Sequence, residues 1–92
     1  DAKKHSFFDE LVKVYTNQID AGNITLPALE LESAFKALAA KHELKPGELM
    51  LPFRIMLVGG KFGPGVFDIV EHIELDATCT RIKNCLQILS QK

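Results

Sequence analysis

The sequence predicts an all-α fold, a compact domain of about four to five helices. Its apolar residues recur every three or four positions, which is the period of a helix, and the Pro and Gly residues that start and stop helices separate the apolar segments. The chain has 92 residues, of which 47% are apolar. This length supports one hydrophobic core but not two, so we expect residues 1–92 to form a single domain.

The first half of the chain predicts two helices. Apolar residues at helical spacing extend over 8–19, Ser6 is a candidate N-terminal cap, and this helix should end before the "DAGN" segment at 20–23. The second helix should begin within 25–27, where a capping residue precedes a proline, and should stop at "LKPG", residues 44–47. Its apolar face is expected to carry Leu31, Ala34, Phe35, Leu38 and His42.

The second half predicts a third, a fourth and a final helix. A Pro-Gly pair and a Gly-Gly pair bound the segment 46–60, so we expect a helix between them, kinked at Pro52. The run 53–58 also suits a short strand, because periodicity does not separate the two, but its flanking signals favour the helix. Pro64 should open the fourth helix, and Asp76 should cap the last. The buried faces of these two helices are expected to carry Val66, Phe67, Val70, Ile73, Cys79, Ile82, Leu86 and Leu89.

Composition excludes several classes of function. The formal net charge is −1, whereas a protein that holds nucleic acid by many phosphate contacts is basic, so the chain alone should bind a polyanion weakly. No uncharged stretch approaches the length of a membrane span. Cys79 and Cys85 point in different directions on a helix, which argues against a disulfide and favours a reducing, cytosolic origin. The opening "DAKKHSFF" has no initiator Met and no signal segment, which predicts a piece of a larger protein.

No combination of residues predicts a catalytic or metal centre. The three histidines, His5, His42 and His72, lack the spacing of metal ligands. The "GGKF" segment at 59–62 lacks the upstream Gly and the following Ser or Thr of a phosphate-binding loop. Cys79 and His72 fall on different predicted helices, and no third group is placed to orient them. We therefore expect no catalytic residue, metal or cofactor in this chain.

Three short motifs follow one another in the segment 44–70. They are Pro52-Phe53-Arg54, Leu57-Val58-Gly59 and Gly63-Pro64-Gly65-Val66-Phe67. With the flanking segments "LESAFKALAAKHEL" at 31–44 and "TRIKNCLQIL" at 80–89, they resemble the C-terminal anticodon-binding subdomain of bacterial glutamyl-tRNA synthetase, also named glutamate-tRNA ligase. The resemblance covers residues 31–89.

This resemblance implies a function in tRNA recognition. A domain of this family is all-α and receives the anticodon loop of glutamate tRNA. The parent is a class I, cytoplasmic ligase that joins glutamate to tRNA with ATP in a catalytic domain elsewhere in its chain. The catalytic signatures of that class are missing here, because "HIEL" at 72–75 begins like the HIGH motif but continues with Glu74 and Leu75.

The resemblance also implies which residues contact the tRNA. Arg54 should recognise an unstacked anticodon base, because a guanidinium donates a planar fork of hydrogen bonds and stacks on bases. Leu51 and Val58 stand where family members commonly carry Gln and Thr, so each lacks a hydrogen-bonding side chain. The other residues expected at the anticodon are Leu51, Gly63, Pro64, Gly65 and Val66. The expected contacts with backbone phosphates are Lys45, Lys61, Arg81 and Lys83.

Structural alternatives stay open for these residues. The stem of Arg54 would cover apolar surface while its head reaches water or a carboxylate, the glycines would cap helices, and the lysines would only aid solubility. A second class of function is a helical protein-interaction module. Its apolar docking groove would be formed by Leu51, Phe53, Met56 and Phe62. An anticodon-binding domain should lose affinity steeply with salt, whereas a groove of this kind should not.

Overall fold

The computed structural model describes residues 2–59 and 65–90, and this part of the chain contains helices and no strand. The predicted all-α class is therefore confirmed, and the strand alternative for 53–58 is wrong. None of the described helices is long and apolar enough to cross a membrane. The helices are α1 (Ala2–Asp20), α2 (Ala28–Lys41), α3 (Pro46–Val58) and α4 (Val66–Ser90).

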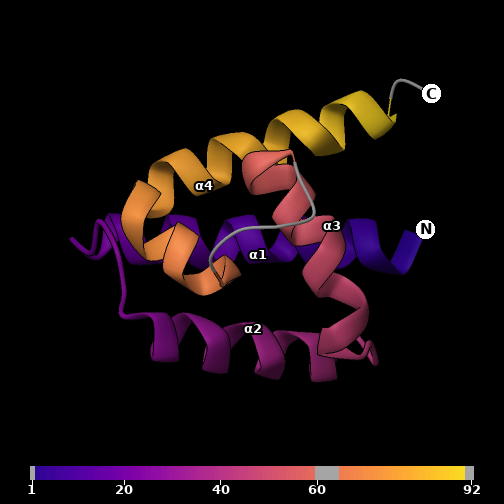
Figure 1. Cartoon of the computed structure of the whole chain (residues 1–92), viewed down its shortest axis with the longest axis horizontal. Coiled ribbons are helices and arrows are strands. Elements are labelled where there is room, and N and C mark those ends of the chain that lie inside the picture. The colour runs from indigo at the N-terminus through magenta and orange to yellow at the C-terminus, as the bar shows by residue number, and fades with distance from the viewer. Residues whose placement is uncertain (1, 60–64, 91–92) are drawn as a thin grey trace.

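Helix α4 connects the parts of the fold. It packs against each of the other three helices. Figure 1 shows α1 and α2 lying alongside each other, α3 crossing from the end of α2 toward α4, and the final part of α4 passing along the side of α1 away from α2. The arrangement brings the first and last helices into contact and leaves one side of α3 at the surface.

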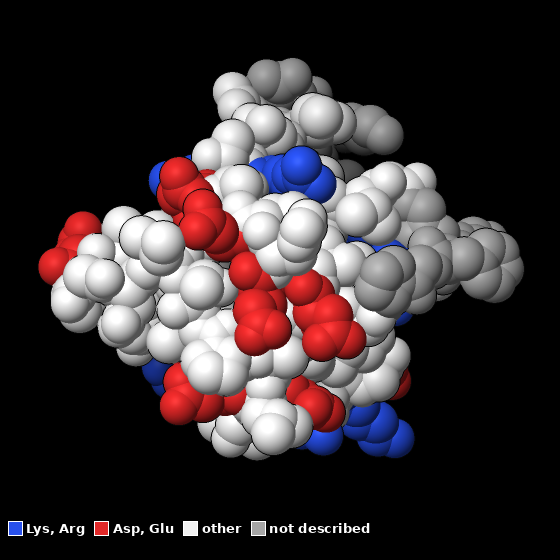
Figure 2. Space-filling model, turned by 60° about the vertical axis from the view of Figure 1, so that its left-hand side comes forward, with Lys and Arg blue, Asp and Glu red and all other residues white. Residues whose placement is uncertain are grey.

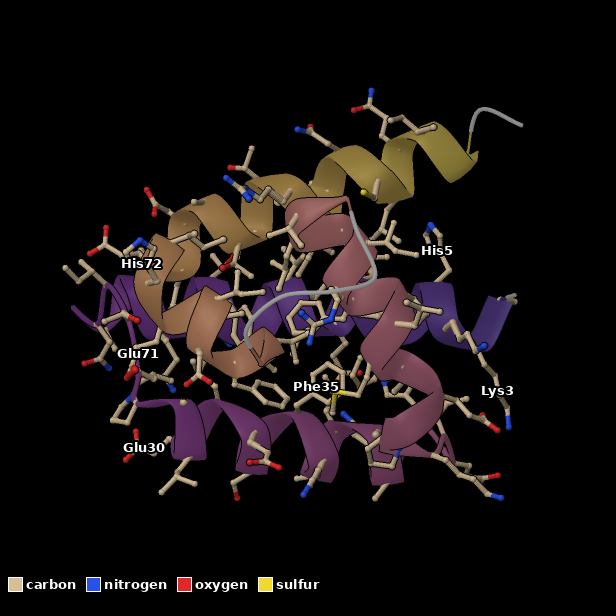
Figure 3. The ribbon with its side chains drawn as sticks, in the orientation of Figure 1. Lys3, His5, Glu30, Phe35, Glu71 and His72 are labelled. Carbon is tan, nitrogen blue, oxygen red and sulfur yellow. The ribbon has the colours of Figure 1, made fainter. Side chains whose placement is uncertain are left out.

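Five phenylalanines hold the four helices together. Phe35 of α2 is their centre, and its ring lies 4.9 Å from Phe7 of α1, 5.1 Å from Phe53 of α3 and 5.3 Å from Phe67 of α4, measured between centroids. Phe8 packs edge-on against Phe7 at 5.0 Å. Figure 3 shows Phe35 directed from α2 into the interior. Aromatic pairs at these distances stabilise a core beyond their simple burial.

Helix α1 begins earlier than the sequence analysis predicted. It extends back to Ala2, so Ser6 lies inside the helix and is not its cap. The reason is that Ala2, Lys3 and Lys4 are good helix formers, and nothing before Ser6 stops the helix. The other end agrees with the prediction, because the helix ends at Asp20 and Gly22 follows with a positive φ of 98°.

Helix α4 consists of two helical segments joined at Glu74. This residue has φ 75° and ψ 167°, which interrupts the helix. The freed backbone N–H of Leu75 donates to the carbonyl of Ile24 at 2.9 Å, in the loop between α1 and α2. The expected division into a fourth and a final helix is thus confirmed. Asp76, the expected cap, lies two residues after the interruption and so stands inside the final segment, where its Oδ1 accepts the N–H of the adjacent Ala77 at 2.8 Å.

The remaining expectations for this half of the chain have mixed outcomes. The expected start of the fourth helix at Pro64 lies outside the described residues, and the described helix begins at Val66. The expected buried faces of the last two helices are largely confirmed, with Ile73 only partly buried and the Leu89 side chain outside the described part. Both cysteines are free, as expected.

Candidate nucleic-acid interface

Helix α3 carries Leu51 and Arg54, two of the four described residues that were expected at the anticodon. Lys45 precedes it in extended conformation, and Pro46 occupies its first turn, where a missing N–H costs nothing. The helix continues through Pro52 and ends at Gly59, whose φ is 72° and whose N–H donates to the carbonyl of Ile55 at 2.8 Å. The predicted start and stop signals of this helix are confirmed.

The two faces of α3 have different environments although both are apolar. Leu49, Phe53 and Leu57 are buried in the core. On the outer side, Leu51, Ile55 and Val58 expose 47%, 45% and 48% of their surface. The outer face is therefore an apolar surface that the described helices leave uncovered.

Arg54 lies on this helix one turn from Leu51 and one turn from Val58, so the three side chains are neighbours on its surface. Arg54 is half-buried, whereas Leu51 and Val58 are exposed. A guanidinium whose stem is held by packing presents its donors with less loss of conformational freedom than a fully exposed one. The structure thus brings together Leu51 and Arg54, two of the residues expected at the anticodon.

The start of α4 places Gly65 and Val66 at a helix N-terminus. The carbonyl of Gly65 accepts the N–H of Ile69 at 3.1 Å, which is the first hydrogen bond of the helix. Val66 is only 4% exposed, so its side chain belongs to the core and only its backbone N–H is suited to contact RNA. A Cβ on Gly65 would lie 3.1 Å from Oδ2 of Asp68, in the first turn. Lys61, Phe62, Gly63 and Pro64 lie outside the described residues.

The cations expected at phosphates lie in three separate places. Arg81 of α4 is exposed, and its Nη1 donates to the carbonyl of Leu57 near the end of α3. Lys45 lies before the other end of α3, about 20 Å away for a helix of this length. Lys83 borders a hollow that it shares with Asp9 and Thr16 of α1. Arg81 and Lys83 therefore face different helices.

The contact between Arg81 and Leu57 was missed by the sequence analysis. The two residues are 24 positions apart, and no local pattern links a cation on one helix with a carbonyl on another. A positive charge near the C-terminus of a helix is favourable, but the sequence gives no sign that this charge comes from α4.

Acidic side chains define a face that RNA would avoid. Figure 2 shows Asp and Glu side chains gathered on the side of the molecule that carries the bend of α4 and the beginning of α2. In Figure 3, Glu30 and Glu71 lie on this side, whereas Lys3 lies at the opposite end. Because phosphates are repelled by a concentration of carboxylates, a polyanion should approach from elsewhere. The acids in these segments are Glu30, Glu32, Glu71, Glu74 and Asp76.

An apolar hollow of about 400 Å³ lies between the outer face of α3 and the final part of α4. Its lining includes Leu51 and Met56, two members of the docking groove that the interaction-module hypothesis named. Phe53, a third member, is fully buried in the core, so that part of the hypothesis is wrong. Phe62 lies outside the described residues. The complete lining is Leu51, Pro52, Ile55, Met56, Cys85 and Ile88.

Comparison with known protein families identifies the family of this chain. A family model described as "Anticodon binding domain" matches residues 7–86. The chain therefore belongs to the anticodon binding domain family. The match begins in α1, so it extends beyond the segment 31–89 in which the motifs had been recognised.

Curated relatives point to one kind of enzyme. The chain is 36% identical over 80 residues to the glutamate-tRNA ligase of Flavobacterium johnsoniae, covering 87% of this chain and 15% of that protein. It is 33% identical over 89 residues to the glutamate-tRNA ligase of an Anaeromyxobacter species, covering 94% and 19%. The chain thus spans less than a fifth of the length of these two relatives. No solved structure matches it.

Proposed function

We propose that this chain binds the anticodon loop of glutamate tRNA for a glutamate-tRNA ligase. The observation that carries the proposal is the family match over residues 7–86, which includes every residue expected at the tRNA. The exposed face of α3, with Arg54 flanked by Leu51 and Val58, is the surface proposed to meet the loop. The acidic side of the molecule supports this proposal because it disfavours an approach of phosphates from that side.

The proposed contacts fall into two groups. Arg54 recognises an unstacked base by its fork of donors, and Leu51 supplies an apolar surface beside it. The second group is Gly63, Pro64, Gly65 and Val66, whose small residues would allow a base to approach, and at the start of α4 the backbone N–H groups are available. The phosphate contacts are assigned to Lys45, Lys61 and Lys83, whereas Arg81, which the sequence also placed there, uses one nitrogen on the carbonyl of Leu57.

The chemistry belongs to the rest of the proposed parent. That protein would be a cytoplasmic class I ligase that attaches glutamate to its tRNA with ATP in a catalytic domain outside these 92 residues. This chain selects the tRNA. We therefore expect the purified chain to form no glutamyl-tRNA.

The test is a nuclear magnetic resonance titration of the 92-residue chain. One sample receives the anticodon stem-loop of glutamate tRNA, and a second receives an unrelated stem-loop of equal length, each at several salt concentrations. We expect resonances of Leu51, Arg54 and Val58 to shift with the glutamate stem-loop, and the affinity to fall as salt rises.

Two results would overturn the proposal. Equal binding of both stem-loops would show that no anticodon base is recognised. Salt-independent shifts confined to the apolar hollow around Ile55 and Ile88 would instead favour the docking of an apolar partner.

A further inference from the structure

Arg81 makes a contact that links the final segment of α4 to the end of α3. Its Nη1 donates a hydrogen bond to the carbonyl oxygen of Leu57, in the last turn of α3. The last carbonyls of a helix have no donors within the helix itself, so this side chain from another element satisfies one of them. It also places a permanent positive charge at the end where the helix dipole is negative.

The carbonyl of Leu57 lies beside the residue that ends α3. Gly59 ends α3 two residues later in the left-handed conformation, with φ 72°, and its N–H bonds to Ile55. The direction in which the chain leaves α3 therefore depends on the geometry of this last turn. Arg54 lies one turn before Leu57, on the same helix.

We infer that Arg81 is a positioning residue for anticodon recognition, which fixes the last turn of α3 and thereby the orientation of Arg54. This inference rests on the proposed function and deepens it. It also gives Arg81 a role different from a phosphate contact. A phosphate contact adds affinity for any RNA, whereas a positioning residue affects the discrimination between anticodons.

Three variants of the 92-residue chain separate these roles. Arg81→Ala removes both the donor and the charge, and Arg81→Lys restores a charge and a single donor. Lys83→Ala is the matched control, because it removes a cation two positions further along the same helix, on the side of α1. Thermal unfolding of each variant is recorded first, so that all measurements are made well below its transition.

The first measurement needs no RNA. The carbonyl carbon shift of Leu57 and the hydrogen exchange rate of the Gly59 amide are compared among the variants. We expect Arg81→Ala to move the carbonyl shift and to raise the exchange rate about tenfold, Arg81→Lys to reverse part of both changes, and Lys83→Ala to change neither. Unchanged values in Arg81→Ala would overturn the inference whether or not the chain binds tRNA.

The second measurement repeats the titration with the glutamate and the unrelated stem-loops over a range of salt. We expect Arg81→Ala to reduce the ratio of the two affinities by about threefold to tenfold and to leave the salt dependence unchanged. An equal loss of affinity for both stem-loops would show a phosphate contact and overturn the inference, if the slope of log affinity against log salt concentration also falls by about one. If the unmodified chain binds neither stem-loop, the proposed function is overturned, and so is the role of Arg81 in anticodon discrimination.

Discussion

The two faces of α3 are alike in composition and opposite in environment. Leu49, Phe53 and Leu57 are buried in the core, whereas Leu51 and Ile55 stand at the surface. A helix that is apolar all round is normally enclosed on every side. One face of α3 therefore maintains the fold, and the other face is available to a binding partner. Substitutions on the two faces should therefore have separable effects.

The largest expected effect comes from a matched pair on α3. Phe53→Ala should destabilise the domain by about 3–5 kcal/mol, because the ring packs against Phe35 and leaves a cavity when truncated. Ile55→Ala, on the outer face, should cost less than about 1 kcal/mol because the side chain is exposed. Denaturant unfolding monitored by circular dichroism measures both values. Equal losses would abolish the distinction between the faces.

The second test concerns binding alone. Arg54→Ala should weaken recognition of the glutamate anticodon stem-loop by about 1–3 kcal/mol, and Arg54→Lys should restore only part, because an ammonium does not reproduce the planar fork. Titration with the two stem-loops gives the affinities, and thermal unfolding gives the stability. If stability falls while discrimination stays constant, the arginine serves to cover apolar surface instead.

Two glycines, one at the end of α3 and one before α4, allow effects on stability to be separated from effects on binding. Gly59→Ala should destabilise the fold by about 1–2 kcal/mol, because its φ of 72° is unfavourable for a residue with a Cβ. Gly65→Ala should change stability by less than about 0.5 kcal/mol, because the added carbon meets only the movable carboxylate of Asp68.

The Gly65 variant is consequently the informative one for RNA. A fall in affinity for the stem-loop without a fall in melting temperature would indicate that a base approaches the start of α4. Retained affinity would limit the role of this glycine to the architecture of the turn.

The smallest expected effect tests stability without recognition. Glu10 of α1 accepts a hydrogen bond from Lys41 of α2 at 2.6 Å and lies 3.0 Å from Nε2 of His42. The hydrogen bond from Lys41 lowers the pKa of Glu10 below its ordinary value of 4.5. A carboxylate with a lowered pKa stabilises the folded state above its unfolded pKa, and the contribution disappears as pH falls through the folded value.

Glu10→Gln should therefore flatten the decline of melting temperature below about pH 4.5, where the Glu10 contribution is lost. Affinity for the stem-loop at neutral pH should not change. A parallel decline in both proteins would mean that this contact between α1 and α2 contributes nothing measurable.

Parts of the molecule were predictable because their signals are local. The bounds of α3 follow from Pro46 and Gly59, which act within their own turn. The core positions follow from helical spacing, as Phe35 illustrates. Ser6 misled the prediction because a capping residue type is also tolerated inside a helix when good helix formers precede it.

The candidate site was less predictable because its features are not local. The contact from Arg81 to Leu57 depends on how α4 crosses α3, and the gathering of acids depends on where α4 bends. Val66 was expected both on a buried helix face and at the anticodon, and the packed helices show that its side chain belongs to the core. Leu51 is as apolar in the sequence as its neighbours, yet its side chain lies at the surface.

The bend at Glu74 also bears on the order in which the chain folds during synthesis. The N–H of the next residue, Leu75, bonds to Ile24, and Cys79 Sγ lies 3.8 Å from the carbonyl of Val12, contacts that join the first helix and its following loop to the last quarter of the chain. Contacts between such distant positions form slowly because a long loop must close first. The final helix must therefore leave the ribosome before α1 gains these contacts, and until then the apolar surfaces that α4 covers on α1 and α2 remain exposed to chaperones and proteases.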